Sequence, residues 1–137
     1  MLTPYKAHFR RAPEAVARVF IRLGFSPNGI TLFGLLLGIL TCLFFLWNRN
    51  SVLFGFLMIL WGLLDAVDGA AARLTNQITK FGSYLDAMCD RIFETAAILV
   101  TAYVSGHWVL SFLLATGAVL ISYAKARAAM EVSVSNT

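Results

Sequence analysis

The chain has 137 residues, of which 59% are hydrophobic, with a net charge of +4 and a mean hydropathy of +0.76. This apolar content exceeds that of soluble domains of similar length, so the composition excludes an ordinary soluble fold and predicts a one-domain integral membrane protein. The two cysteines, Cys42 and Cys89, lie in apolar or helical segments without a partner motif, which indicates small buried residues and implies neither a disulfide framework nor a zinc site.

The first 25 residues are predicted to form an amphipathic juxtamembrane helix. Their basic residues are interrupted by apolar ones, as in Arg18-Val19-Phe20-Ile21-Arg22. This pattern is typical of a helix that lies on anionic lipid headgroups. It differs from a cleavable signal, in which the apolar stretch follows the charges directly. We therefore expect membrane lipids as partners of this cytoplasmic arm, at residues 1–25, and no nucleic acid.

Four apolar stretches follow the arm, at residues 29–47, 52–74, 82–105 and 108–123. Each is near the roughly 20 residues that a helix needs to cross a bilayer, the last being somewhat short. Ser26-Pro27-Asn28 is typical of a helix start and marks the entry to the first stretch. We expect an all-α polytopic helical bundle of about four spans at residues 26–130, followed by a tail at residues 131–137.

The basic residues predict how these spans are oriented. If the N-terminus is cytoplasmic, ten of the eleven Lys and Arg residues lie on the cytoplasmic side, and Arg49 alone lies outside. This asymmetry follows the positive-inside tendency. We expect a protein of the cytoplasmic membrane with its N-terminus, and the link between its second and third spans, on the cytoplasmic side.

Four of the seven acidic residues, Asp65, Asp68, Asp86 and Asp90, lie beside that link. A carboxylate near hydrocarbon costs about 2.5 to 3.5 kcal/mol on insertion scales, so such groups are kept mainly for function. Asp65 and Asp68 are three residues apart and Asp86 and Asp90 are four apart, so each pair lies along one face of a helix. Because the link at residues 74–81 is short, the two helices are predicted to be antiparallel neighbours whose carboxylates face each other.

These carboxylates predict a site for one or two divalent cations, since without a cation they would repel one another. Ligands that are all oxygen favour magnesium first, with manganese or calcium as alternatives. Gly69 and Gly82 leave room for a phosphate to approach, and Arg73 offers a planar donor for phosphate oxygens. The set indicates a pyrophosphate site and phosphoryl transfer, in which one carboxylate removes the proton of an incoming hydroxyl.

The pattern Asp-x2-Asp-Gly-x2-Ala-Arg-x8-Gly-x3-Asp-x3-Asp, which begins at Asp65 and ends at Asp90, resembles the signature of the CDP-alcohol phosphotransferase family at every position. The resemblance implies a binuclear metal site on the four aspartates, with Asp90 also acting as the catalytic base. It further implies that Gly69, Arg73 and Gly82 hold the CDP moiety of a CDP-lipid, such as CDP-diacylglycerol or CDP-archaeol.

The start of the first span, in the pattern Ser-Pro-Asn-x2-Thr, is also similar to that family, so Asn28 and Thr31 are expected to contribute to CDP-lipid binding. The reaction that the resemblance implies transfers a phosphatidyl-type group to an alcohol hydroxyl and releases CMP. The end of the fourth span, residues 122–127, is similar to members that accept inositol phosphate. Lys125 and Arg127 would then bind the phosphate of the acceptor, or else they are positive-inside anchors. Glycerol phosphate or serine is the alternative acceptor.

Members of this family usually have six spans, whereas this sequence has room for four, so the resemblance covers about two thirds of a usual member. A truncated relative that binds CDP-lipid without turnover is therefore an alternative. We expect the protein to pair with itself.

Two further interpretations of the acidic residues stay open. One is a cation transporter, since carboxylates within membranes also line ion paths. The other is a charged helix rim paired with Arg73 and Arg91. Glu94, one turn after Asp90, is expected to pair with Arg91 or another polar neighbour, or else to be a fifth ligand or a hydrogen-bond partner of the ligands. His107 is expected at an outer surface.

Overall fold

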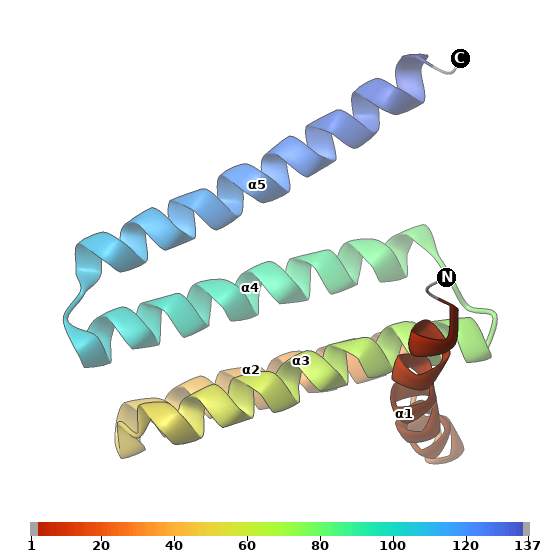
Figure 1. Cartoon of the computed structure of the whole chain (residues 1–137), viewed down its shortest axis with the longest axis horizontal. Coiled ribbons are helices and arrows are strands. Elements are labelled where there is room, and N and C mark those ends of the chain that lie inside the picture. The colour runs from red at the N-terminus through yellow and green to blue at the C-terminus, as the bar shows by residue number, and fades with distance from the viewer. Residues whose placement is uncertain (1–2, 136–137) are drawn as a thin grey trace. The chain divides into compact units, whose positions relative to one another are not determined.

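The computed structural model describes residues 3–135, with side chains described for residues 12–131. Five α-helices account for most of this range: α1 (Thr3–Arg22), α2 (Pro27–Asn48), α3 (Ser51–Leu74), α4 (Lys80–Ser105) and α5 (Trp108–Ser135), as labelled in Figure 1. No strand occurs between residues 3 and 135, so the all-α prediction is confirmed. Residues 1–2 of the predicted arm and 136–137 of the predicted tail lie outside the described range.

The chain divides into two compact units, residues 1–93 and residues 94–137. The first unit contains α1, α2, α3 and the first half of α4, and with them all four aspartates of the predicted site. The second contains the end of α4 and the whole of α5.

Capping side chains define the starts of three helices. The Ser26 hydroxyl accepts the backbone N–H of Gly29 at 3.1 Å, which confirms the helix start predicted at Ser26. The Asn50 amide oxygen accepts two backbone N–H groups of α3, each at 3.1 Å. The Thr79 hydroxyl accepts the N–H of Gly82 at 2.9 Å. These caps satisfy N–H groups that a helix start leaves unpaired, so the links before α3 and α4 can be short.

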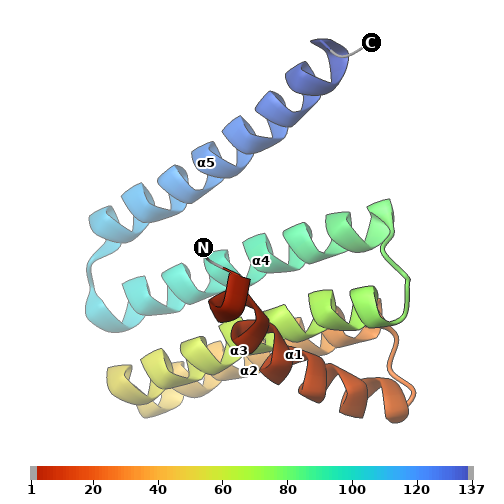
Figure 2. The ribbon, with the colours of Figure 1, turned by 45° about the vertical axis from the view of Figure 1, so that its right-hand side comes forward.

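Within the first unit, α3 packs along α2 and against α1, as Figures 1 and 2 show. Small and branched side chains make this contact, and each is at most 3% exposed: Ala17 of α1, Ile30 of α2, and Val67, Ala70 and Ala71 of α3. Small residues allow membrane helices to approach closely. The predicted arm is therefore a helix that docks on the part of α3 that carries Asp68.

Three of the described helices are long and apolar enough to cross a membrane: α2, α3 and the Trp108–Glu131 part of α5. On α2, the side chains of Leu32, Leu36, Leu40 and Leu43 form a stripe in which each residue is 50–56% exposed. Such a stripe is unfavourable in water and favourable in lipid. The protein is therefore a membrane protein.

The two last helices differ from the sequence prediction. With 26 residues α4 is long enough to cross a bilayer, but it is not among the three sufficiently apolar helices, because Asp86, Asp90, Arg91 and Glu94 lie within its first 15 residues. Its crossing stays a prediction. Helix α5 has 28 residues and continues to Ser135, so most of the predicted tail is helical.

Candidate functional site

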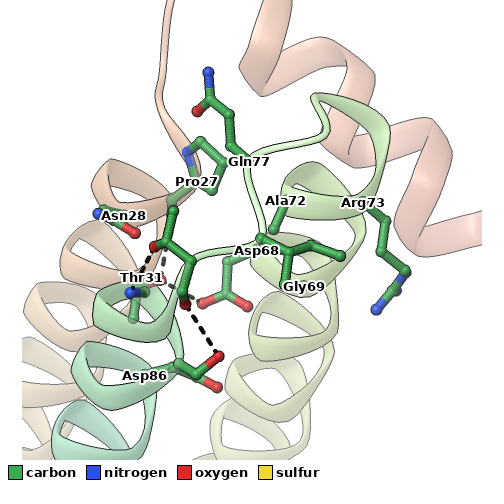
Figure 3. Close-up of a pocket in the computed structure, with 13 residues that line it drawn as sticks. Pro27, Asn28, Thr31, Asp68, Gly69, Ala72, Arg73, Gln77 and Asp86 are labelled. Atoms are coloured by element: carbon green, nitrogen blue, oxygen red, sulfur yellow. Dashed lines mark hydrogen bonds between the residues drawn. The ribbon is translucent and has the colours of Figure 1, made fainter.

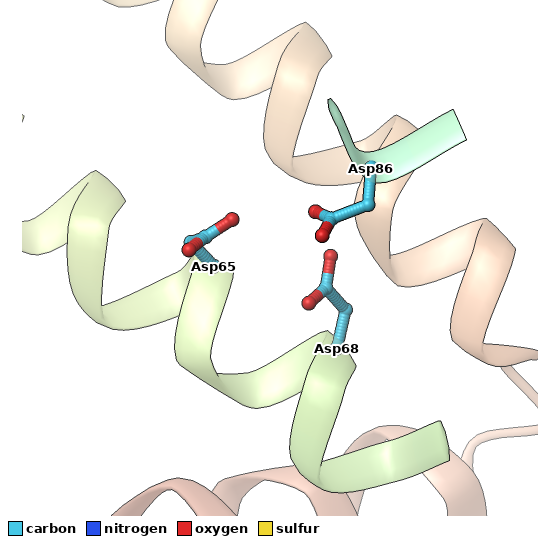
Figure 4. Close-up of side chains that lie close together, drawn as sticks. All are labelled: Asp65, Asp68 and Asp86. Carbon is cyan, nitrogen blue, oxygen red and sulfur yellow. The ribbon is translucent and has the colours of Figure 1, made fainter. Parts of the chain in front are cut away.

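Three of the four predicted aspartates meet between α3 and α4. One carboxylate oxygen from each of Asp65, Asp68 and Asp86 lies within 4.8 Å of the other two, and Figure 4 shows the three groups directed toward one another. Oxygens on opposite sides of an octahedral magnesium lie about 4 Å apart, because each Mg–O bond is about 2.1 Å. The three side chains therefore need only a small adjustment to hold a divalent cation between the two helices.

One oxygen atom of Asp86 supplies a second observation that fits a bound cation. Its Oδ1 is buried and has no hydrogen-bond partner in the part of the chain that the structure describes. A buried polar atom without a partner is costly, and more so beside other carboxylates. A divalent cation would satisfy this atom, so the residues present fit the metal that the sequence predicted.

Asp90 lies one turn after Asp86 on α4 and lines one small cavity together with the other three aspartates. It is not part of the group whose oxygens lie within 4.8 Å of one another. Glu94 does not join that group either, so its assignment as a fifth ligand gains no support from the described residues. Asp90 is thus placed beside the close carboxylates, within reach of the same cavity.

Thr31 holds one carboxylate in place from a different helix. Its hydroxyl, on α2, donates to Asp68 Oδ2 at 2.7 Å, and Asp68 is itself only 8% exposed. A hydrogen bond to a charged group contributes about 1.5–3 kcal/mol. The resemblance assigned Thr31 to CDP-lipid binding, and the described contact adds a role in orienting Asp68, one of the predicted metal ligands. The sequence carries no signal for this pair because 37 residues separate the two.

Thr31→Val is expected to weaken divalent-cation binding about tenfold or more, because the isosteric side chain removes the hydroxyl that donates to Asp68. Thr31→Ser keeps the hydroxyl and is the matched control, with affinity near that of the unchanged protein. Titration of Mn²⁺ into the purified protein measures both. Equal affinities in the two variants would contradict an orienting role for the hydroxyl.

A pocket of about 250 Å³ opens beside the carboxylates. All five residues expected to bind CDP-lipid line it: Asn28, Thr31, Gly69, Arg73 and Gly82. Figure 3 shows Asn28 of α2 and Arg73 of α3 on opposite sides of this pocket. Asp68 and Asp86 also line it, so the pocket and the close carboxylates are continuous. Sequence reasoning missed Gln77, Thr79 and Ser83 of the lining, although they are polar residues in or beside the α3–α4 link.

Gly82 lies where α4 closely approaches the start of α2. A Cβ at this position would lie 3.1 Å from both Asn28 Oδ1 and Thr79 Oγ1, which is tighter than ordinary contacts. At Gly69 a Cβ would meet only the Arg73 guanidinium, at 3.5 Å. The space predicted beside Gly82 is therefore partly filled by the Asn28 side chain at the start of α2. The space beside Gly69 stays open to the pocket.

The predicted acceptor residues, Lys125 and Arg127, lie on α5 in the second unit and are exposed. Arg127 Nε lies 3.2 Å from Glu131 Oε1, one turn further along the helix, and both side chains are more than 60% exposed. Exposed ion pairs of this kind contribute little stability, so the Arg127 charge is available for another partner. Acceptor binding by these residues stays a prediction.

Curated relatives resemble the chain over most of its length. It is 33% identical over 130 residues to archaetidylinositol phosphate synthase of Pyrococcus horikoshii, which covers 93% of this chain and 68% of that protein. It is 32% identical over 127 residues to phosphatidylinositol phosphate synthase of Mycobacteroides abscessus, which covers 88% of this chain and 58% of that protein.

Two crystal structures of Mycobacterium tuberculosis phosphatidylinositol phosphate synthase share the fold at 27% identity. The complex with manganese and citrate matches with a TM-score of 0.79 over 87% of this chain and 60% of that one. The structure with CDP-DAG bound matches with a TM-score of 0.79 over 88% and 64%. The chain thus spans less than two thirds of these solved relatives. Since the family model for CDP-alcohol phosphatidyltransferase matches residues 25–136, the chain belongs to that family.

Proposed function

We propose that the protein transfers a phosphatidyl-type group from a CDP-lipid to a hydroxyl of inositol phosphate and releases CMP. The observation that carries this proposal is the continuity of the Asp65, Asp68 and Asp86 carboxylates with a pocket lined by Gly69 and Arg73. Two relatives are synthases of inositol phosphate lipids, and one solved relative has been crystallised with CDP-DAG and with manganese.

The described side chains suggest how this reaction would run. Magnesium bound by the aspartates, as one ion or two, would neutralise the phosphate oxygens of the CDP-lipid. Arg73 would donate to the same oxygens, and Asp90 would take the proton of the acceptor hydroxyl. The hydroxyl oxygen then bonds to the lipid-linked phosphorus, the bond from that phosphorus to the bridging oxygen breaks, and its electron pair leaves with CMP.

The test is CMP release by the full chain in liposomes that contain CDP-diacylglycerol or CDP-archaeol. Inositol phosphate, glycerol phosphate, serine and inositol are compared, each with and without magnesium. We expect release only with inositol phosphate and magnesium. Release with another acceptor would reassign the substrate. Magnesium-dependent CDP-lipid binding without release under any condition would identify a relative that binds but does not turn over.

The acceptor assignment makes its own prediction. Lys125→Ala and Arg127→Ala are each expected to raise the KM for inositol phosphate about tenfold or more, because each removes a charged partner of the acceptor phosphate. The KM for CDP-lipid should not change. Lys125→Arg preserves the charge and serves as the control. If the KM for inositol phosphate changes in neither alanine variant, the two residues are membrane anchors rather than acceptor ligands.

We also propose that the protein lies in the cytoplasmic membrane with its N-terminus and site on the cytoplasmic side. Ten of its eleven Lys and Arg residues support this orientation. Labelling of a cysteine introduced at Arg49, the one basic residue expected outside, tests it in intact cells. Pairing of the protein with itself stays a prediction, which the mass of the purified protein in detergent would decide.

A further inference from the structure

About one helical turn from the carboxylates, two aromatic rings pack against a glycine of α2. The rings of Trp61 on α3 and Phe93 on α4 have centroids 3.9 Å apart and planes inclined by 30°. A Cβ on Gly38 of α2 would lie 2.5 Å from Phe93 Cδ2 and 2.9 Å from Trp61 Nε1. Phe93 is only 2% exposed and Gly38 is also buried. We call Trp61, Phe93 and Gly38 the three-helix lock.

A hydrogen bond fixes the orientation of the indole in this lock. Trp61 Nε1 donates to the backbone carbonyl oxygen of Gly34 at 3.1 Å, one turn before Gly38 on α2. An indole N–H away from water needs such a partner. Because the ring must both donate to Gly34 and stack on Phe93, its position relative to α2 and α4 is defined at once.

The lock and the carboxylates share the same helix faces. Trp61 lies four residues before Asp65 on α3, and Phe93 lies three residues after Asp90 on α4. Residues at these spacings are neighbours on one side of a helix. Trp61 and Gly34 also line the small cavity that the four aspartates line. The ring contact therefore stands next to the carboxylates on both helices.

We propose that the three-helix lock sets the separation between the carboxylates of α3 and those of α4, so that Trp61 and Phe93 are positioning residues for the metal site. Magnesium demands near-ideal octahedral geometry. A change in the separation of α3 and α4 would therefore lower the affinity of the site for the metal. The inference rests on the proposed function only for its turnover readout, because metal binding can be measured without CDP-lipid.

The test is Gly38→Ala in the full chain, which places a methyl group where the two rings leave no room. The Kd for Mn²⁺, measured by electron paramagnetic resonance of the free ion without CDP-lipid, is expected to rise about tenfold or more. The metal concentration that gives half-maximal CMP release should rise by the same factor. The KM for CDP-lipid at saturating metal should stay unchanged, whereas a general loss of packing would change that KM as well.

Two variants separate this effect from ordinary helix disruption. Gly55→Ala, on α3, makes the same change where no atom lies within 4 Å of the new Cβ, and it should keep the original Mn²⁺ affinity. Phe93→Leu leaves the helix backbone unchanged but removes the ring that packs on Trp61, and it should also raise the Kd for Mn²⁺. An unchanged Kd in Gly38→Ala would overturn the proposal, as would an unchanged Kd in Phe93→Leu.

If Gly38→Ala does not fold, Trp61→Phe takes its place. It keeps a ring on Phe93 but cannot donate to Gly34, and it should also raise the Kd for Mn²⁺. Unchanged affinity in that variant overturns the lock. An unaltered chain that binds Mn²⁺ but releases no CMP would overturn the proposed function, and the affinities of the variants would still decide the lock.

Discussion

Asp90→Asn is expected to lower kcat for CMP release by about 10²- to 10⁴-fold while CDP-lipid still binds. Asp90 lines the carboxylate cavity but lies outside the close group of Asp65, Asp68 and Asp86. The amide has the shape of the carboxylate but cannot take up the proton of the acceptor hydroxyl, whereas the three close carboxylates are retained. Steady-state CMP release at saturating magnesium, together with calorimetric titration of CDP-lipid, measures the two effects separately.

Glu14→Gln is the matched control for this change, since it converts a carboxylate to an amide on α1, outside the carboxylate cavity. Both turnover and CDP-lipid binding should be unaffected there. Retained turnover in Asp90→Asn would remove the assignment of Asp90 as base. Joint loss of turnover and CDP-lipid binding would show that Asp90 acts first as a metal ligand.

Asp65→Asn is expected to abolish metal binding and, with it, the magnesium-dependent binding of CDP-lipid. Of the three close carboxylates among the described residues, Asp68 and Asp86 would remain, with Asp90 beside them in the same cavity. A neutral amide also removes a full negative charge from the group that attracts the cation. Mn²⁺ titration followed by CDP-lipid titration at fixed magnesium measures this loss. Full CDP-lipid binding in the variant would contradict a metal-dependent site.

The same variant is expected to be more stable than the unchanged protein when no metal is present. Three carboxylate oxygens within 4.8 Å of one another repel in the absence of a cation, and Asp65→Asn relieves part of that repulsion. In EDTA, the Tm of Asp65→Asn should therefore exceed that of the unchanged chain. Added magnesium should raise the Tm of the unchanged chain only, because a ligand stabilises the state that binds it. A lower Tm for the variant in EDTA would contradict net repulsion at Asp65.

Local patterns determined a large part of this protein. The helix start at Ser26 and the apolar lengths of α2 and α3 depend on residues adjacent in sequence, and the structure shows both. The aspartate spacing on α3 and the short link before α4 likewise predicted that carboxylates from the two helices would meet. The chemistry of hard oxygen ligands then indicated a divalent cation without any knowledge of the fold.

Only the tertiary structure decided which partners those residues have. The hydrogen bond from Thr31 to Asp68 joins residues 37 positions apart in the sequence. The contact of Trp61 with Phe93 joins α3 to α4, and both rings pack against Gly38 of α2. Periodicity places a residue on a helix face, but the distance across to another helix is set by the side chains packed between them. For the same reason spacing alone made the four aspartates equivalent, whereas packing places one oxygen from each of three within 4.8 Å of the others and places Asp90 in the same cavity, next to Asp65.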